Sequence, residues 1–226
     1  MLSSLEYHTW IERESDTFAS VLDTAPLDAR VPGCPEWALR DLAGHLGRVQ
    51  RLWTDVIRAG VDVLPTFPTS MSGPADAGEL AAWMRDSTRN LLDAIRTTPF
   101  DTPAWAWWRD DHTVGAIARH QVQEVAVHRW DAQSAVGTPD PIAMEIADDG
   151  VDEFLWIARQ MRGPAPVTFV ATDSGRSFSA SEGASAVTVS AAASDLVLLL
   201  YGRVPPDDVL VEGDRATLHD ALMPIG

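Results

Sequence analysis

The sequence predicts an α+β fold, in which an N-terminal four-helix bundle is followed by a small C-terminal α+β domain. In the first two thirds of the chain, four segments of about 20 residues each place apolar side chains at helical spacing. After residues 137–141, which contain two prolines and a glycine, short β-like runs alternate with helical segments. We therefore expect two domains, residues 1–138 and residues 139–226.

The first two helices are predicted from capping signals and apolar stripes. Ser3 and Glu6 have the spacing of a capping box at the start of the first helix, which continues to Leu22. Pro35 is well placed as the first residue of the second helix, which we expect to end near Gly60. The predicted inward face of this second helix consists of Leu39, Leu42, Leu46, Val49, Trp53 and Val56.

The third and fourth helices follow a long loop. Residues 61–75 carry three prolines and small polar side chains, which are typical of a loop. The third helix is expected over residues 77–96, and the fourth over residues 113–136 with Gly137 as its stop. Because two of the connections are long, the bundle need not have a simple up-and-down topology.

The C-terminal domain is predicted to mix helices and strands. Helices are expected over residues 142–161 and 192–201, and a short helix at the C-terminus. The predicted strands are residues 167–171, 177–180, 186–190 and 209–212, with turns at residues 173–175 and 182–183.

Composition and charge exclude several classes of function. The chain has 33 acidic and 17 basic residues, which gives a net charge of −16, so it is a poor candidate for binding nucleic acid or an anionic membrane. No apolar run is long enough to span a bilayer, and the N-terminus does not resemble a signal peptide. The single cysteine, Cys34, excludes a disulfide framework and is expected to be structural. We therefore expect a cytoplasmic protein.

Three side chains form a candidate metal site. His45 lies on or beside the apolar stripe of the second helix, while Glu124 and His128 are four residues apart on one face of the fourth. Two histidines and one carboxylate are a common ligand set for a catalytic divalent metal with an open coordination position. From spacing alone, a hydrogen-bonded core histidine and a surface Glu–His pair remain as alternatives. Asp131 either orients a liganding imidazole or makes a bond near the helix end.

The surroundings of these residues resemble the mycothiol-dependent maleylpyruvate isomerase family. The resemblance rests on residues 32–37 (PGCPEW) and 39–46 (LRDLAGHL), on Arg119 and Glu124, and on residues 128–132 (HRWDA). It extends through DSGR at 173–176, ASDL at 193–196, Gly202, Arg203 and VEGD at 211–214, and so covers nearly the whole chain. The family has a DinB-like metal-binding four-helix bundle and a C-terminal domain that is reminiscent of sterol-carrier modules.

The resemblance implies a set of ligands and binding residues. It implies that His45, Glu124 and His128 bind a divalent metal, usually zinc, and that mycothiol is the thiol cosubstrate, which would place the source among actinobacteria. It also implies that Arg203 faces the cleft between the two domains, where its guanidinium would hold a carboxylate of substrate or cofactor during catalysis, although a cation near a helix C-terminus is the structural alternative. Apart from the resemblance, Arg89, with Arg85 on the same helix, is a further candidate for holding an anionic group of the cofactor, and the alternative for both is a position facing solvent.

The implied activity is a thiol-dependent reaction of a small-molecule substrate. The metal would lower the pKa of the thiol, and the resulting thiolate would act in a cis–trans isomerase of a maleylpyruvate-like acid or in an S-transferase. We expect no nucleic-acid or membrane partner, and a monomer or homodimer. Metal-dependent hydrolysis without a thiol, and a non-catalytic zinc-binding or redox-sensing protein, are the alternative functions.

Overall fold

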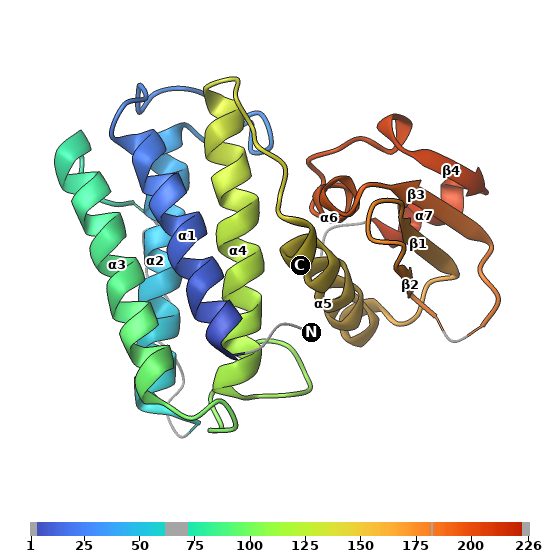
Figure 1. Ribbon diagram of the computed structural model, residues 1–226, viewed down its shortest axis with the longest axis horizontal. Helices are drawn as coiled ribbons and strands as arrows, with labels where there is room; N and C mark the ends of the chain where they lie inside the picture. The colour runs from blue at the N-terminus through green and yellow to red at the C-terminus, as the bar shows by residue number, and fades with distance from the viewer. Residues whose placement is uncertain (1–3, 62–71, 182, 223–226) are drawn as a thin grey trace. The chain divides into compact units, whose positions relative to one another are not determined.

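The computed structural model describes residues 4–61, 72–181 and 183–222. The chain forms two compact units, residues 2–140 and residues 141–226 (Figure 1). The first unit contains the helical bundle, and the second contains all the strands of the described sheet. The predicted α+β fold class is therefore confirmed.

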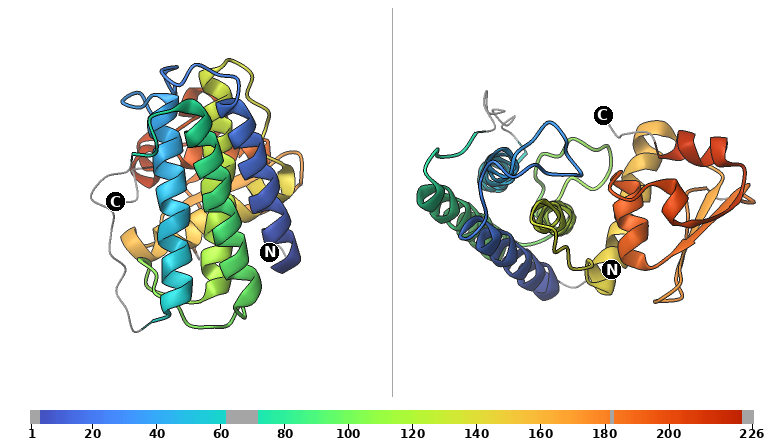
Figure 2. Two further views of the ribbon diagram at one scale, coloured as in Figure 1. Left: turned by 90° about the vertical axis from the view of Figure 1, so that its left-hand side faces the viewer. Right: turned by 90° about the horizontal axis from the view of Figure 1, so that it is seen from above.

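The N-terminal unit is a bundle of α1 (Ser4–Leu22), α2 (Leu39–Ala59), α3 (Ala77–Thr97) and α4 (Val114–Ala135). Helices α1 and α4 run in one direction and α2 and α3 in the other (Figures 1 and 2). Around the bundle, α1 and α2 each contact both α3 and α4. Consecutive helices that run in the same direction need a long connection between them. The loop predicted at residues 61–75 falls between α2 and α3, and its residues 62–71 lie outside the described residues.

The apolar stripe of α2 packs into the core of the bundle as predicted. Its buried members are Leu39, Leu42, Leu46, Trp53 and Val56, whereas Val49 is only partly buried. Leu80, Met84 and Leu91 of α3 are also fully enclosed. Burial of such side chains stabilises the bundle by roughly 1.5–3 kcal/mol each, and it fixes how α2 is rotated about its axis. That rotation decides which way His45 points.

The predicted start of α2 at Pro35 is wrong, because the helix begins at Leu39. The backbone of Ala38 is extended and forms an isolated antiparallel bridge with Arg30, so it cannot also adopt helical geometry. The Ala38 N–H donates to the Asp41 carboxylate at 2.9 Å, which satisfies a donor at the helix start. Residues 34–37 instead form a turn closed by the Trp37 N–H bond to the Cys34 carbonyl. The start of the first helix at Ser3 cannot be compared, since Ser3 lies outside the described residues.

The C-terminal unit begins with α5 (Met144–Arg162) and contains a four-stranded sheet. Its strands are β1 (Val167–Ala171), β2 (Ser177–Ser179), β3 (Val187–Ala191) and β4 (Leu210–Gly213), in the order β2-β1-β3-β4. The central β1–β3 pair is parallel and the two outer pairs are antiparallel. Helices α6 (Ala193–Leu200) and α7 (Arg215–Ala221) both contact the sheet, and α6 also packs on α5. The strands lie within one residue of the predicted ranges.

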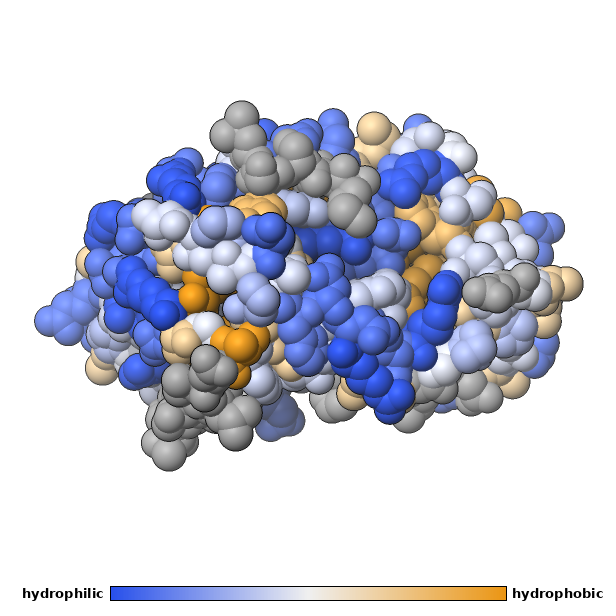
Figure 3. All heavy atoms as spheres, turned by 90° about the horizontal axis from the view of Figure 1, so that it is seen from below, coloured by the Kyte–Doolittle hydropathy of each residue, from blue (hydrophilic) through white to orange (hydrophobic). Residues whose placement is uncertain are grey.

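One face of the surface is mainly polar. Most of the face in Figure 3 is hydrophilic, and apolar side chains occupy only small areas of it. None of the helices in the described ranges combines the length and hydropathy that a membrane-spanning segment requires.

Candidate metal centre

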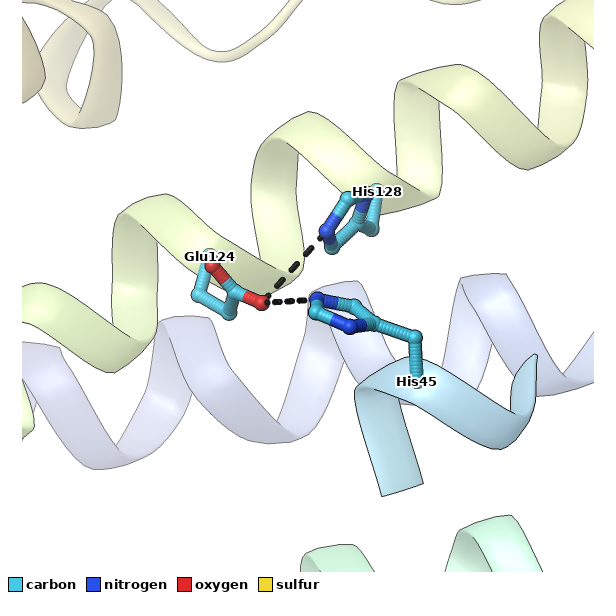
Figure 4. Close-up of side chains that lie close together, drawn as sticks. All are labelled: His45, Glu124 and His128. Carbon is cyan, nitrogen blue, oxygen red and sulfur yellow. Dashed lines mark hydrogen bonds and ion pairs between the residues drawn. The ribbon is translucent and has the colours of Figure 1, made fainter. Parts of the chain in front are cut away.

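Helices α2 and α4 bring His45, Glu124 and His128 together, although His45 is 79 residues from Glu124 in the sequence. One potential ligand atom from each residue lies within 4.8 Å of the other two. Figure 4 shows both imidazole rings directed at the Glu124 carboxylate. Because Glu124 and His128 are one turn apart on α4, they present their side chains on the same face of the helix.

The distances match those of ligands around one small cation. The His45 Nε2 lies 3.1 Å from Glu124 Oε1, and the His128 Nε2 lies 3.4 Å from the same oxygen. Two atoms bound to one zinc ion at about 2.0–2.1 Å with tetrahedral angles are about 3.3 Å apart. Two imidazole nitrogens and a carboxylate oxygen are also a donor set that zinc accepts. The residues present therefore fit a divalent metal.

The three side chains of the site differ in their exposure. The His128 side chain is 9% exposed, whereas those of Glu124 and His45 are 18% and 22% exposed. The cluster is therefore partly buried, and His45 is the most exposed of its three side chains.

The electrostatics of the site couple Glu124 to His128. Burial by itself would lower the pKa of His128, but the charge of Glu124 and hydrogen bonds to Glu124 and Asp131 raise that pKa to about 9. Burial would likewise raise the pKa of Glu124, but the His128 charge and the hydrogen bonds from both histidines hold it well below the ordinary value. The carboxylate is thus ionised and ready to act as a ligand.

Asp131 is fully buried and orients His128. The His128 Nδ1–H donates to Asp131 Oδ2 at 2.9 Å, and the Asp131 side chain is completely shielded from solvent. A metal would have to displace the Nε2 proton of His128, and this bond would then keep the remaining proton on Nδ1 and leave the Nε2 lone pair facing the site. Of the two roles predicted for Asp131, the structure supports the orientation of an imidazole.

Asp131→Asn is expected to weaken zinc binding by about 10–100-fold without unfolding the protein. The amide keeps the size of the carboxylate but loses the charge that fixes the His128 tautomer and increases its basicity. Competition with a chromophoric chelator would measure the affinity. Asp93→Asn on α3, where the carboxylate is exposed, is the control, and an equal affinity in all three proteins would contradict the role of Asp131.

Two further side chains lie beside the site, and the sequence did not assign them to it. The Trp37 ring centroid is 4.9 Å from that of His45 and 6.3 Å from that of His128, so the indole packs against both imidazoles. The Cys34 Sγ lies 4.0 Å from Asp131 Oδ2. Both residues belong to the turn before α2. Because this turn was predicted to start the helix, no signal in the sequence placed it against α4.

The three candidate arginines are distributed over both units. On α3, Arg85 is hydrogen-bonded to Asp23, while Arg89 has a 73% exposed side chain and pairs with Asp86 at 3.0 Å. Arg203 lies in the C-terminal unit, after α6, and its Nη1 donates to the Tyr201 carbonyl at 2.6 Å. The roles of Arg203 and Arg89 stay predictions.

Comparisons with known proteins agree with this architecture. The family model of the mycothiol maleylpyruvate isomerase N-terminal domain matches residues 10–133, and that of the MDMPI C-terminal domain matches residues 82–219, so the two overlap on α3 and α4. Among solved structures, the mycothiol-dependent maleylpyruvate isomerase and its histidine-to-alanine mutant are similar, with TM-scores of 0.74 and 0.77. Each is 15% identical, with 94% of this chain and 95% of theirs covered, which establishes a common fold. No curated protein matches the sequence.

Proposed function

Because the chain belongs to the mycothiol maleylpyruvate isomerase family, we propose that it is a metal-dependent enzyme that uses mycothiol as its thiol cosubstrate. The reaction is either the cis–trans isomerisation of a maleylpyruvate-like acid or the transfer of the thiol to an electrophile. The observation that carries this proposal is the convergence of His45, Glu124 and His128 within 4.8 Å, on the partly exposed seam between α2 and α4.

Each residue of the site has a distinct task in this proposal. His45 and His128 offer their Nε2 atoms as ligands, and Glu124 supplies the negative charge that a cation needs in a partly buried place. Asp131 holds the proton on His128 Nδ1, and Trp37 limits the rotation of both imidazoles. A divalent cation bound there supplies Lewis acidity, which lowers the pKa of a coordinated thiol. The chain then needs no nucleophile of its own.

An isomerase and a transferase would differ in the number of cations that they need near the substrate. A maleylpyruvate-like acid carries two carboxylates, so an isomerase needs at least two cations near the substrate, whereas a transferase for neutral electrophiles needs fewer. We propose Arg203 as the residue that holds the anionic group, by a bidentate contact of its guanidinium, and Arg89 as a second candidate. Arg89 would first have to leave Asp86, and its exposed ion pair is weak enough to allow that.

The test is metal analysis and thiol titration on the wild type and on His45→Ala. The wild type is expected to retain about one zinc per chain, as three protein ligands predict, and to bind mycothiol more tightly with zinc than without it. His45→Ala removes one ligand and is expected to lose both properties. His219→Ala, which changes an exposed histidine on α7, is the matched control and should behave as the wild type does.

The results distinguish the alternatives. Equal thiol binding with and without zinc would refute thiol activation by the metal. Turnover of an amide in the absence of any thiol would support a hydrolase. Zinc retention with no thiol-dependent turnover would support a non-catalytic zinc protein.

A further inference from the structure

A cluster of aromatic rings lies at the end of the bundle where α4 begins, and the proposed chemistry gives it no task. The rings come from α2, from α4 and from the loop between α3 and α4 (Figure 1). They belong to Trp53, Trp105, Trp107, Trp108 and His120, and we call these five side chains the aromatic cluster. Neighbouring ring centroids are between 5.2 and 6.4 Å apart, so the rings pack directly on one another.

The aromatic cluster continues the seam between α2 and α4 that holds the proposed metal ligands. His120 lies four residues before Glu124, which is one turn, or about 6 Å, along α4. Trp53 lies eight residues after His45, which is about 12 Å along α2, and its ring contacts that of His120 at 6.4 Å. His120 and Glu124 are both partly exposed, whereas the residues between them are buried. A ligand of the proposed metal therefore needs to extend by only one to two helical turns to touch the aromatic cluster.

Trp107 is the member of the aromatic cluster that a ligand can contact. It is 40% exposed, whereas Trp108 is 2% exposed. Among the tyrosines, phenylalanines and tryptophans that the structure describes, Trp107 is the most exposed. Its ring meets Trp108 at 5.3 Å and His120 at 5.7 Å, with interplanar angles of 78° and 75°. Because these two rings hold one side of the indole, the rest of its surface is an aromatic platform that faces solvent.

The loop that presents Trp107 is held by its own hydrogen bonds. The Trp108 Nε1–H donates to the Asp111 carbonyl at 3.1 Å, and His112 Nε2 donates to the Trp108 carbonyl at 2.6 Å. Asp111 has a φ of 56°, a conformation that is unfavourable for a residue with a side chain and that persists where the surrounding contacts fix it. A ring that is already fixed loses little conformational entropy when a ligand binds to it.

We propose that Trp107 and His120 bind a planar aromatic group of the substrate, which stacks on the open surface of the indole. An uncharged aromatic ring gains both from the burial of its apolar area and from ring stacking. A saturated ring of the same size has no π face and gains only from burial. This assignment rests on the proposed function, because the neighbouring metal centre is what makes the stacked molecule a substrate. Binding of the ring itself requires neither metal nor thiol.

Calorimetric titration of the full-length protein tests the binding of the ring. The probes are 1,3-dinitrobenzene, which is planar, neutral and without a leaving group, and nitrocyclohexane, which is neutral but saturated. Dinitrobenzene is expected to bind the wild type at least about tenfold more tightly than nitrocyclohexane does, since only the planar ring can stack. No binding of dinitrobenzene at millimolar concentration would overturn the proposal.

Trp107→Leu removes the stacking surface but keeps an apolar side chain. It should weaken dinitrobenzene binding by about tenfold and leave the binding of nitrocyclohexane unchanged, and Trp107→Phe should restore most of the affinity. Trp10→Leu is the matched control, because that indole lies on α1 against the Arg13 guanidinium and outside the aromatic cluster. Circular dichroism of all three variants should stay that of the wild type. Equal dinitrobenzene binding by Trp107→Leu and the wild type would contradict the proposal.

Kinetics with mycothiol tests whether the stacked molecule is a substrate. The electrophiles are 1-chloro-2,4-dinitrobenzene and the small aliphatic iodoacetamide. In both reactions the thiol sulfur bonds to carbon, the halide leaves with the electron pair of the broken bond, and the thiol proton passes to solvent. Trp107→Leu should raise KM for the aromatic electrophile by about tenfold without changing kcat, and should leave both constants for iodoacetamide unchanged. An unchanged KM for the aromatic electrophile would overturn the role of Trp107 in substrate binding.

The two measurements separate the aromatic site from the proposed function. Dinitrobenzene binding that persists in His45→Ala would show that the ring binds independently of the proposed metal. Dinitrobenzene binding that is sensitive to Trp107→Leu, without thiol-dependent turnover by the wild type, would refute the proposed function and leave the aromatic site standing.

Discussion

Replacing Arg129 by methionine is expected to lower the free energy of unfolding of the N-terminal unit by about 3–5 kcal/mol. Arg129 lies on α4 and Glu14 on α1, and their Nε and Oε2 atoms are 2.7 Å apart. Their side chains are only 4% and 7% exposed. Methionine leaves the Glu14 carboxylate buried without its partner, and a lone buried charge is far more costly than the ion pair is favourable.

The same arginine also holds the segment that follows α4. Its Nη1 donates to Gln133 Oε1 and to the Asp140 carbonyl, both within 2.7 Å, so it ties the segment after α4 to the helix. Loss of Arg129 therefore also removes the donor to the Asp140 carbonyl, which adds to the cost of the unpaired Glu14. Since His128 precedes Arg129 directly, the junction of α1 and α4 also supports the helix that carries the proposed ligands Glu124 and His128.

Urea denaturation followed by tryptophan fluorescence would measure this loss. Eight of the nine tryptophans belong to the N-terminal unit, so the signal reports on the bundle. Arg96→Met is the control, because Arg96 and Glu12 form an exposed pair at 3.6 Å that is worth at most about 1 kcal/mol. The double variant Arg129→Met/Glu14→Met should regain most of the stability, since it removes both charges. Additive losses in that double variant would contradict the explanation.

The helices of the bundle could be predicted because each carries a sustained apolar stripe. The stripe of α2 alone placed His45 beside the core, and the spacing of Glu124 and His128 placed both on one face of α4. The start of α2 was missed because it depends on a tertiary contact. Pro35 is a favourable first helical residue locally, but the Arg30–Ala38 bridge holds the chain extended up to Leu39. Local propensity cannot show a bridge to a residue outside the helix.

The composition of the site was predicted more completely than its surroundings. Residue type and spacing identified the three candidate ligands in the sequence, and the structure brings them together. The packing of Trp37 on both imidazoles follows from the path of the turn before α2, which has no periodic signal. The pairing of Arg89 with Asp86 is a local contact on α3, and the sequence could not decide between it and a bound anion. Contacts between segments that lack periodicity therefore needed the structure.

Replacing Glu124 by glutamine is expected to weaken zinc binding by at least about 100-fold. Loss of a residue that only hydrogen-bonds to a ligand, such as Asp131, costs about 10–100-fold in metal affinity, and loss of the ligand itself should cost at least as much. Glu124 is the only anionic member of the cluster of His45, Glu124 and His128, and its Oε1 lies within 3.4 Å of both Nε2 atoms. The amide keeps the shape of the side chain but cannot neutralise a divalent cation in a partly buried place. The bundle should still fold, because the amide oxygen can accept a hydrogen bond from His45.

Thermal unfolding with and without zinc gives an independent measure of the same effect. A cation that binds only the folded protein stabilises the wild type by about 4 kcal/mol when its concentration is 1,000 times the dissociation constant. At the same zinc concentration, Glu124→Gln should gain less than half of this stabilisation. If its site is 100-fold weaker, zinc is present at only about ten times the dissociation constant. Glu145→Gln, in the exposed first turn of α5, should show the full wild-type gain. An undiminished gain in Glu124→Gln would mean that the cation binds without this carboxylate, and that the seam between α2 and α4 is not its site.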